Sequence, residues 1–431
     1  MSMEIVTLTP DRQKELMEKL LERKGAGYGK FEGTVNEIVE TVRRGGDEAL
    51  LRYTEELDHI RLTAAEMEVT AEEIEEAYRQ TDPALVEVIR SALVNIRAYH
   101  EKQKRTSWFD SREDGVILGQ KITALERVGV YVPGGKAAYP SSVLMNIVPA
   151  RTAGVREIVM TTPPGRDGRV NPHTLVAAHE AGADRIFKAG GAQAVAALAF
   201  GTETIPKVDK IVGPGNIFVA LAKKAVFGYV GIDSIAGPSE ITVLADETAN
   251  PRYVAADLLS QAEHDEMASA ILVTTSVEMA EKVRSEIEGF LKVLERREIM
   301  EKSLRDYGAL LVAPSLEAGI AAVNEIAPEH LEIVTQNPFD VMTRIRNAGA
   351  IFLGAYSSEP LGDYFAGPNH ILPTNGTARF FSPLSVDDFI KKSSIICYSE
   401  EALAAVHGQI ETFARAEQLT AHANSIAVRF E

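Results

Sequence analysis

The feature that most constrains this chain is a regular alternation of short apolar runs with longer amphipathic runs, from about residue 116 to residue 353. The short runs are typical of β-strands, and the longer runs have helical spacing. Strand–helix alternation with short loops predicts mainly parallel sheets with helices on both faces. The expected strands are 116–125, 128–132, 158–161, 185–188, 210–212, 231–232, 241–245, 270–274, 310–313, 331–334 and 350–353. The expected helices are 142–153, 172–181, 192–200, 217–227, 251–264, 277–297, 316–326 and 341–347.

The alternation runs in two consecutive sets, and a chain of 431 residues exceeds what one core usually supports. We therefore expect an α/β protein with two Rossmann-like domains, residues 116–237 and 238–373. A mainly helical N-terminal region, residues 1–115, precedes them. The tail, residues 374–431, has too little apolar surface to stand alone. It is expected to hold a short strand near residue 395 and helices at 400–418 and 420–428.

Charge and composition exclude several classes of protein. The 45 basic and 62 acidic residues give a net charge of −17, so the surface repels nucleic acid and anionic membranes. No apolar run approaches the roughly 20 residues of a membrane span, and the first ten residues do not resemble a signal peptide. The single cysteine, Cys397, lies in a strand-like run and is expected to be packed there. These features predict a cytoplasmic protein with no nucleic-acid or membrane partner.

Three glycine-rich turns each follow an expected strand and precede an expected helix. They are residues 132–136 (Val-Pro-Gly-Gly-Lys), 190–193 (Gly-Gly-Ala-Gln) and 213–216 (Gly-Pro-Gly-Asn). Such turns let a phosphate approach the backbone N–H groups of a helix start, and ligands of α/β sheets bind beyond these strand ends. None matches the full G-x-G-x-x-G fingerprint, so each alone is typical of an ordinary tight turn. Three in one domain favour a nucleotide site.

Residues 327–332 read Ala-Pro-Glu-His-Leu-Glu and bring Glu329 and His330 side by side. Histidine exchanges protons near neutral pH, and a neighbouring carboxylate polarises a water or a hydroxyl. Such a pair is also common on protein surfaces at the end of a helix. The stretch is therefore a candidate acid–base pair that needs support from the rest of the chain.

Scattered side chains could bind a metal. Gln261 and His264 are three apart on an expected helix, so they share a face. Asp363 and His370 lie in a polar, Gly/Pro-rich loop, and His422 lies in the expected tail helix. Zinc accepts imidazole nitrogen and carboxylate oxygen, whereas an amide oxygen is a less usual ligand. No C-x-x-C or H-E-x-x-H spacing is present, so these positions are equally compatible with helix-face or loop histidines.

Residues 236–240, Ala-Gly-Pro-Ser-Glu, join the two sets of alternating elements. A Gly-Pro turn of this kind is typical of a simple connection, and it could also line a cleft between the two domains.

These stretches resemble histidinol dehydrogenases. The resemblance rests on residues 231–240 (GIDSIAGPSE), 261–264 (QAEH), 327–331 (APEHL) and 362–374 (GDYFAGPNHILPT), and it extends over nearly the whole chain. It implies an NAD-dependent, zinc-containing enzyme that oxidises L-histidinol to L-histidine, the last step of histidine biosynthesis. The reaction consumes two NAD⁺ through an aldehyde-level intermediate. The resemblance also implies a homodimer in which tail residues complete the partner's active site.

The resemblance further implies a role for individual residues. The zinc ligands are Gln261, His264, Asp363 and His422. The catalytic base is His330, with Glu329 beside it. The substrate contacts are Ser239, Gln261, His264, His330, Asp363, His370, Glu417 and His422. The NAD contacts are Tyr131, Gln193 and Asn216.

The chemistry of aldehyde oxidation gives a separate reason to expect a general base in this chain. Oxidising an aldehyde to an acid by hydride transfer first requires a tetrahedral adduct, formed with a cysteine or with water. Because Cys397 is expected to be packed, water addition is the available route, and it needs a general base such as Glu329 or His330. Zinc would mainly orient the imidazole and amine of the substrate.

Two other classes of protein would share part of this pattern. A zinc-dependent hydrolase acting on a small amine substrate would use the same His, Asp and Glu residues, but it would not need three glycine-rich strand ends. A non-catalytic nucleotide-binding protein would keep those turns and have no use for Glu329 and His330.

Overall fold

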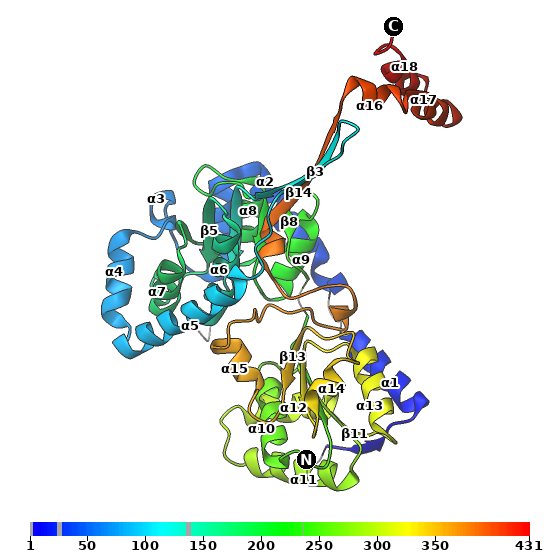
Figure 1. Cartoon of the computed structure of the whole chain (residues 1–431). Coiled ribbons are helices and arrows are strands. Elements are labelled where there is room, and N and C mark those ends of the chain that lie inside the picture. The colour runs from blue at the N-terminus through cyan, green and yellow to red at the C-terminus, as the bar shows by residue number, and fades with distance from the viewer. Residues whose placement is uncertain (1–2, 24–27, 135–138, 236) are drawn as a thin grey trace. The chain divides into compact units, whose positions relative to one another are not determined.

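The computed structural model describes residues 3–23, 28–134, 139–235 and 237–431. The chain divides into two compact units, each built from two separate segments (Figure 1). Unit 1 comprises residues 1–103 and 125–389, and unit 2 comprises residues 104–124 and 390–431. Among the described residues, no helix combines the length and the apolar character that a membrane crossing requires.

Unit 1 contains two parallel sheets. The first has five strands in the order β6-β5-β4-β7-β8, and every neighbouring pair is parallel. The strands β4, β5 and β6 are buried almost throughout, as expected for a parallel sheet covered on both faces. The strands are β4 (Arg127–Tyr131), β5 (Glu157–Thr162), β6 (Arg185–Lys188), β7 (Lys210–Val212) and β8 (Gly231–Ile232).

Local signals set the limits of the helices between these strands. Proline stands in the first turn of α6 and α7, and the side chains of Asn171 and Asn216 cap α7 and α9. Gly154 and Gly182, both in the left-handed conformation, end α6 and α7. The helices are α6 (Pro140–Ala153), α7 (Pro172–Ala181), α8 (Gly191–Phe200) and α9 (Ile217–Val226).

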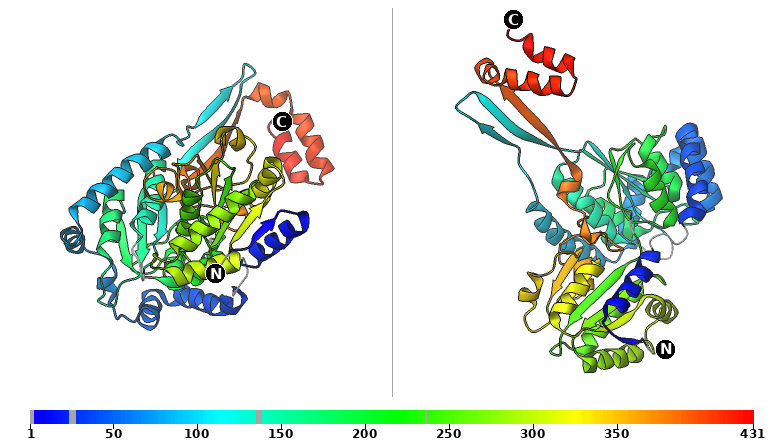
Figure 2. Two further views of the ribbon diagram at one scale, coloured as in Figure 1. Left: turned by 90° about the horizontal axis from the view of Figure 1, so that it is seen from below. Right: turned by 90° about the vertical axis from the view of Figure 1, so that its right-hand side faces the viewer.

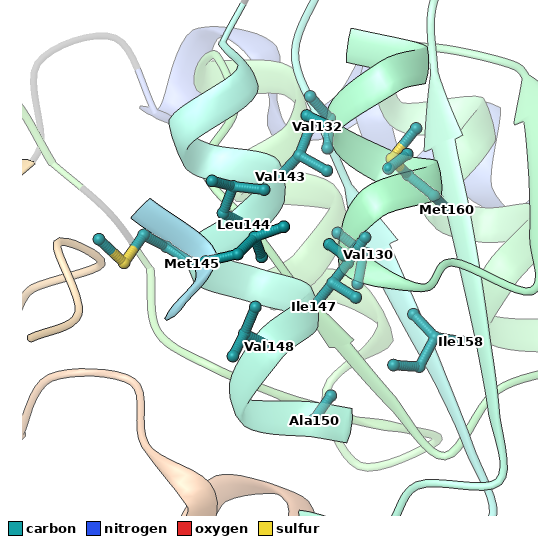
Figure 3. Close-up of a cluster of buried hydrophobic side chains, with 14 of the residues drawn as sticks. Val130, Val132, Val143, Leu144, Met145, Ile147, Val148, Ala150, Ile158 and Met160 are labelled. Atoms are coloured by element: carbon teal, nitrogen blue, oxygen red, sulfur yellow. The ribbon is translucent and has the colours of Figure 1, made fainter. Parts of the chain in front are cut away.

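Apolar packing of α6 against the first sheet forms one core cluster (Figure 3). Val143 and Ile147 of α6 pack with Val130 of β4 and Ile158 of β5, and all four are fully buried. Because interiors pack densely, this contact fixes the start of α6 relative to the end of β4, where ligands of such sheets bind.

The N-terminal helices cover existing elements of unit 1. Helix α2 packs on α8 and α9, and α5 packs on α6, whereas Leu16 and Leu20 of α1 join a core cluster of the second sheet. Helix α2 bends at Gly46, which has a φ of 53°, and a Cβ there would collide with the Glu203 carboxylate. These helices are α1 (Pro10–Glu22), α2 (Tyr28–Asp58), α3 (Ala64–Met67), α4 (Ala71–Gln80) and α5 (Pro83–Glu101).

The second sheet has six strands in the order β1-β11-β10-β9-β12-β13, again all parallel. Strand β1, which the sequence pattern did not predict, adds the N-terminal segment to one edge of this sheet. The strands are β1 (Ile5–Thr7), β9 (Glu240–Ala245), β10 (Ser269–Thr274), β11 (Ala309–Val312), β12 (His330–Val334) and β13 (Ala350–Leu353). The associated helices are α10 (Pro251–Ala262), α11 (Val277–Phe290), α12 (Arg297–Tyr307), α13 (Leu316–Ile326), α14 (Pro338–Met342) and α15 (Glu359–Tyr364).

The prediction of a single helix at residues 277–297 is wrong. The chain forms α11, then a series of turns, then α12. Met300 and Leu304 of α12 belong to the core cluster of the second sheet, and α12 packs on α10 and β10. Burying these two side chains requires the chain to turn after α11 instead of continuing the helix.

Unit 2 combines a three-stranded antiparallel sheet with three helices. The strand expected at residues 116–125 pairs antiparallel with β14 and β2, so it is not part of the first parallel sheet (Figure 2). The helix expected at 400–418 is interrupted and forms α16 and α17. The elements of unit 2 are β2 (Trp108–Ser111), β3 (Val116–Ala124), β14 (Ile390–Tyr398), α16 (Glu400–Ala404), α17 (His407–Ala416) and α18 (Thr420–Ala427).

Cys397 lies on β14, as a strand was expected there, but its side chain is exposed. The prediction that Cys397 is packed is therefore wrong. Most residues of β14 and all residues of β2 are exposed to solvent in the sheet of unit 2. The predicted α/β fold with mainly parallel sheets is confirmed.

Unit 1 also contains two short 3-10 helices after α15, Thr377–Arg379 and Val386–Phe389.

Candidate active site

His330 is the first residue of β12, which pairs with β9 on one side and β13 on the other, and Glu329 directly precedes it. Helix α13 ends at Ile326, and its cap residue Ala327 has a left-handed backbone with a φ of 50°; Pro328 follows. This short turn leads the chain directly into the strand. Both ionisable side chains are buried, with 7% of Glu329 and 3% of His330 exposed.

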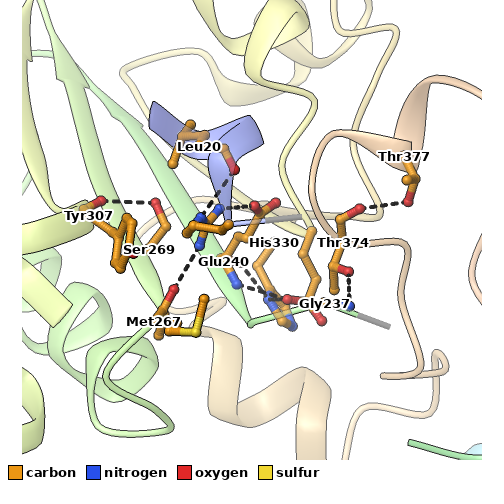
Figure 4. A network of polar contacts seen from close by, with 12 residues as sticks. Leu20, Gly237, Glu240, Met267, Ser269, Tyr307, His330, Thr374 and Thr377 are labelled. Carbon is orange, nitrogen blue, oxygen red and sulfur yellow. Dashed lines mark hydrogen bonds and ion pairs between the residues drawn. The ribbon is translucent and has the colours of Figure 1, made fainter. Parts of the chain in front are cut away.

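The main chain of Glu240, the first residue of β9, holds both side chains (Figure 4). Its N–H group donates to Oε2 of Glu329 at 2.8 Å, and its carbonyl oxygen lies 2.9 Å from Nδ1 of His330. A carbonyl oxygen only accepts hydrogen bonds, so Nδ1 of His330 carries a hydrogen. The other ring nitrogen, Nε2, has no hydrogen-bond partner among the described residues. It is therefore the atom of His330 that is available for proton transfer.

Burial and neighbouring charges perturb the pair. Burial raises the pKa of Glu329, because a carboxylate loses its hydration inside the protein. Burial alone would lower the pKa of His330, but the negative charges of Glu329 and Asp363 outweigh it and raise that pKa. Two ionisable groups with strongly perturbed pKa values in one buried place are typical of a catalytic site.

A candidate metal site lies next to this pair. The possible ligand atoms of His264, Glu359 and Asp363 all lie within 4.8 Å of one another. Gln261 is 1% exposed, and neither its Oε1 nor its Nε2 has a hydrogen-bond partner among the described residues. A buried amide without partners is unusual, and the Gln261 oxygen is a possible metal ligand. An imidazole, two carboxylates and an amide oxygen are a donor set that fits zinc.

Asp363 does not lie in a loop, as the sequence predicted, but on the short helix α15. Its helical neighbour one turn earlier is Glu359, a residue that the sequence analysis missed. Two hydrogen bonds fix the start of this helix. The N–H group of Glu359 donates to Oε1 of Glu332 at 2.9 Å, and Oγ of Ser260 donates to Oε2 of Glu359 at 2.9 Å. Burial raises the pKa of Glu359 to about 7. A sequence signal for this helix was available: Pro360 is typical of a first helical turn, and Asp363 follows Glu359 by four residues.

His264 lies just beyond α10, not on the helix itself. Its N–H group donates to the carbonyl oxygen of Gln261 at 3.2 Å, which continues the helical direction for one more turn. The expectation that Gln261 and His264 share one helix face is therefore wrong for His264. The turn nevertheless places the imidazole within reach of Glu359 and Asp363.

His370 lies in a loop, as expected, and contacts Asp363. Its Nδ1 is 3.0 Å from the main-chain oxygen of Asp363, and its Nε2 is 3.4 Å from Oγ of Ser142 at the start of α6. The neighbouring Asn369 donates through Nδ2 to the main-chain oxygen of Met145 at 2.7 Å. The loop thus carries His370 from the end of α15 to the start of α6.

Ser239 is partly exposed and directly precedes Glu240. Its main-chain oxygen accepts a hydrogen bond from the N–H group of Ser269 at 2.9 Å. The N–H group of Gly237 donates to Oγ1 of Thr374 at 2.7 Å, so residues 237–240 are tied to the loop after α15. Ala236, which belongs to the same sequence stretch, lies outside the described residues.

The three predicted cofactor contacts lie at carboxyl ends of strands in the first sheet. Tyr131 ends β4, and its hydroxyl accepts from the N–H group of Gly191 at 3.1 Å. Gln193 lies in the first turn of α8, and its Nε2 is 3.4 Å from Oδ2 of Asp58. Its Oε1 has no hydrogen-bond partner in the described part of the chain. Asn216 caps α9 by accepting from two N–H groups. Parallel strands present these three positions on one edge of the sheet.

Asp58 at the end of α2 is not among the predicted site residues, and no local sequence pattern marks it. Burial raises the pKa of this carboxyl group to about 6. Gly135 and Lys136 of the first glycine-rich turn lie outside the described residues.

Glu417 and His422 belong to unit 2, whereas the other predicted site residues belong to unit 1. Glu417 ends α17 and His422 lies on α18, and both are exposed. They line a groove of about 840 Å³ between these two helices. The remaining lining is mainly apolar and includes Ile410, Phe413 and Leu419.

Two parallel sheets, a buried Glu–His pair whose Nε2 has no hydrogen-bond partner among the described residues, and a neighbouring group of possible metal ligands are together typical of an enzyme active site. Comparison with known proteins identifies its family. Residues 21–430 match the family described as histidinol dehydrogenase. The histidinol dehydrogenase of Clostridium acetobutylicum is 56% identical over 97% of this chain and 96% of its own length. That of Bacillus subtilis is 59% identical over 94% of each chain. The chain belongs to the histidinol dehydrogenase family.

A solved structure agrees with this assignment. The crystal structure of histidinol dehydrogenase from Elizabethkingia anophelis has a TM-score of 0.92, with 37% sequence identity over 99% of this chain and 98% of that one. The predicted family, the oxidoreductase class and the role in histidine biosynthesis are confirmed. Family membership also disfavours the zinc-dependent hydrolase that the sequence left open.

Proposed function

We propose that this chain oxidises L-histidinol to L-histidine with NAD⁺ in two successive steps, as the last reaction of histidine biosynthesis. Besides family membership, one observation supports this: His330 is buried, its Nδ1 is held by Glu240, and its Nε2 has no hydrogen-bond partner among the described residues. A fixed imidazole with one free nitrogen is what proton removal from an alcohol and from a hydrated aldehyde requires.

His330 acts as the base in both oxidations. In the first, Nε2 takes the proton of the alcohol hydroxyl as the carbon loses a hydride and becomes an aldehyde. In the second, it takes a proton from a hydroxyl of the hydrated aldehyde as the same carbon becomes a carboxylic acid. When bound, NAD⁺ accepts the hydride in each oxidation. Glu240 keeps the ring oriented, because its carbonyl oxygen holds Nδ1–H throughout.

Glu329 serves the step between the two oxidations. The aldehyde must add water, and the attacking water must lose a proton. The Glu329 carboxylate, held at Oε2 by the Glu240 N–H group, is placed beside His330 to accept it. The exposed position of Cys397 removes one argument for water addition, so this route now rests on Glu329 and His330 themselves.

Gln261, His264 and Asp363 would hold a zinc ion, together with His422 from the tail. The fit rests on the unpaired amide of Gln261 and on the closeness of the imidazole and carboxylate ligand atoms. When bound, zinc orients the imidazole and amine of histidinol. Glu359 fixes the place of Asp363 from the preceding helical turn. Ser239, His370 and Glu417 would contribute further substrate contacts.

Tyr131, Gln193 and Asn216 would contact NAD⁺ at the edge of the first sheet. The unpaired, buried Oε1 of Gln193 supports this assignment, because it leaves an acceptor free. In this proposal residues 116–237 form the NAD side, and residues 238–373 carry the zinc and catalytic residues. Residues 1–115 form the N-terminal region.

Residues 374–431 would contact a partner subunit in a homodimer, so that Glu417 and His422 complete the partner's site. Unit 2 supports this role, because the apolar side chains of Ile410, Phe413 and Leu419 line one open groove and Phe413 is 72% exposed. Apolar side chains left so open are typical of an interface. A cytoplasmic location stays a prediction.

The direct test is to mix the purified protein with L-histidinol and NAD⁺ and to follow the absorbance of NADH. We expect two NADH for each histidine formed. A hydrolase would yield no NADH, and a nucleotide-binding protein would bind NAD⁺ without turnover; either outcome contradicts the proposal. His330→Asn serves as the control for catalysis by a contaminating enzyme.

A further inference from the structure

A buried ion pair lies behind the catalytic residues. Arg23, which ends α1, pairs through Nη2 with the carboxylate of Glu240, and the side chains are 0% and 6% exposed. Nη1 of Arg23 donates to the main-chain oxygen of Met267 at 2.9 Å, and Nε donates to that of Leu20 at 3.4 Å. The guanidinium carbon lies 5.3 Å from the centroid of the Tyr307 ring. Each nitrogen of the guanidinium group therefore has a partner, and Figure 4 labels the three partner residues, Leu20, Met267 and Glu240.

Glu240 connects this ion pair to the reaction. Its side chain binds Arg23, while its main chain holds Glu329 through the N–H group and His330 through the carbonyl oxygen. The side chain of one residue is thus anchored in the N-terminal segment, and its backbone orients both catalytic groups. Any rotation of the peptide groups of Glu240 would move the two catalytic side chains together.

Stability alone does not explain such a pair. Moving two ions out of water has a large desolvation cost, and apolar side chains of similar size usually stabilise a protein at least as well. An ion pair with a planar, forked donor does fix directions, which an apolar contact does not. The pair is therefore better explained by the orientation of Glu240 than by the free energy of unfolding.

We propose that Arg23 is a positioning residue for histidinol oxidation, which acts through Glu240 to hold His330 and Glu329 in their reactive orientation. This inference rests on the proposed function. It assigns a role in the reaction to Arg23, which is not among the predicted site residues.

The test separates positioning from stability. In the double variant Arg23→Met/Glu240→Leu, the buried ions are replaced by apolar side chains, so the fold is expected to persist. We expect kcat for both oxidations to fall by about 10- to 100-fold, because small misplacements of catalytic groups have effects of this size. The KM for histidinol should stay within about threefold of wild type, since the ion pair touches neither substrate nor metal ligands.

The matched control is Arg127→Met/Glu157→Leu, which removes a partly buried ion pair at the amino ends of β4 and β5, away from the carboxyl ends that carry the predicted cofactor contacts. Its kcat should equal that of the wild type. Thermal unfolding of all three proteins shows whether each is folded at the assay temperature. A folded Arg23→Met/Glu240→Leu variant with wild-type kcat would overturn the inference.

Nitrogen-15 NMR of the imidazole rings gives a readout that does not depend on turnover. The protein has nine histidines, and the His330 signals are those missing from His330→Asn. We expect the Nδ1 signal of His330 to shift in the Arg23→Met/Glu240→Leu variant and to stay in place in the control. An unchanged signal would contradict positioning, whether or not the wild-type protein oxidises histidinol.

If the double variant does not fold, the single variant Arg23→Lys tests the inference instead. Lysine keeps the charge but cannot reach Glu240 and the two main-chain oxygens in one plane. A folded lysine variant with a lower kcat and a shifted His330 signal supports the inference, and one with wild-type values for both refutes it.

Discussion

Nε2 of His330 lies 3.7 Å from Oδ1 of Asp363. The proposed base and a proposed metal ligand are thus close neighbours, although the former begins β12 and the latter lies on α15. In the proposed mechanism, His330 removes protons and Asp363 helps to hold the zinc ion that orients the substrate, so the two roles are assigned to neighbouring residues.

The roles of His330 and Glu329 can be separated by mutation. His330→Asn should slow the oxidation of alcohol and aldehyde alike, because both release a proton to Nε2. Glu329→Gln should impair the second oxidation more than the first, because water addition belongs to the second. Loss of a positioned base typically slows a reaction by on the order of 100- to 10,000-fold. Each variant is assayed with histidinol and, separately, with the aldehyde.

The control for this experiment is Cys397→Ser, which removes the only thiol of the chain. It should retain both oxidations, because water and not sulfur adds to the aldehyde. A Glu329→Gln variant impaired only with the alcohol would show that the division of roles is wrong.

Metal removal should stop turnover without unfolding the chain. Gln261, His264, Asp363 and Glu359 are carried on α10, its following turn and α15, all of which pack on other elements of unit 1. A zinc ion that oriented substrate would therefore be dispensable for folding, in contrast to a structural zinc. Circular dichroism, NAD⁺ binding and activity are followed together during chelation. Simultaneous loss of all three signals would refute a substrate-orienting role, and added zinc should restore activity.

Mixing two inactive variants tests whether sites are shared in a dimer. His330→Asn alters unit 1, and His422→Ala alters the tail. If the tail completes the partner's site, a mixed dimer has one site with both lesions and one site with none. Random pairing makes half of the dimers mixed, so about a quarter of wild-type activity should return after joint refolding.

Each variant refolded alone must stay inactive. Mixed dimers are identified by a purification tag on one variant. Tagged mixed dimers without activity would mean that every chain builds its own site.

Acid should destabilise the protein through His100. This residue is 0% exposed; Nδ1 contacts Oε1 of Gln103 at 2.7 Å, and Nε2 contacts Nδ2 of Asn369 at 3.5 Å. Burial lowers its pKa from 6.5. The folded state therefore favours the neutral ring, and the unfolded chain binds more protons below pH 6.5. The stability that His100 contributes is present above pH 6.5 and is lost as the pH falls from 6.5 toward the folded-state pKa.

Urea unfolding between pH 8 and pH 5 measures this loss. A single histidine changes the free energy of unfolding by up to about 1.4 kcal/mol per pH unit in that window. His100→Gln should reduce the slope, and His173→Gln on α7 is the control that should leave it unchanged. Equal slopes in all three proteins would count against the assignment.

Local sequence signals predicted the helices and strands whose limits are set by residues close to them in the chain. Most strands and helices of the two parallel sheets lie within a few residues of their expected limits, because proline, asparagine and glycine mark the helix ends. The Glu329–His330 pair was visible for the same reason, as two adjacent residues before a strand.

Contacts between segments that are far apart in the chain could not be predicted from the sequence. Arg23 and Glu240 are joined only by folding, and no spacing in the sequence connects them. Asp363 was expected in a loop because its stretch is rich in glycine and proline, yet Glu332 and Ser260 fix that stretch as a helix from outside. The pairing of β3 with β14 likewise depends on tertiary structure, since either strand alone fits a parallel sheet equally well.

That pairing also has a consequence for synthesis of the protein. The ribosome releases β2 and β3 early, but their partner β14 emerges only after both parallel sheets of unit 1 have been made. Two isolated strands are only marginally stable in water, and until β14 is made one edge of β3 has no partner strand. The growing chain must therefore carry an unfinished sheet edge through most of its translation, and unit 2 can be completed only in the last moments of synthesis.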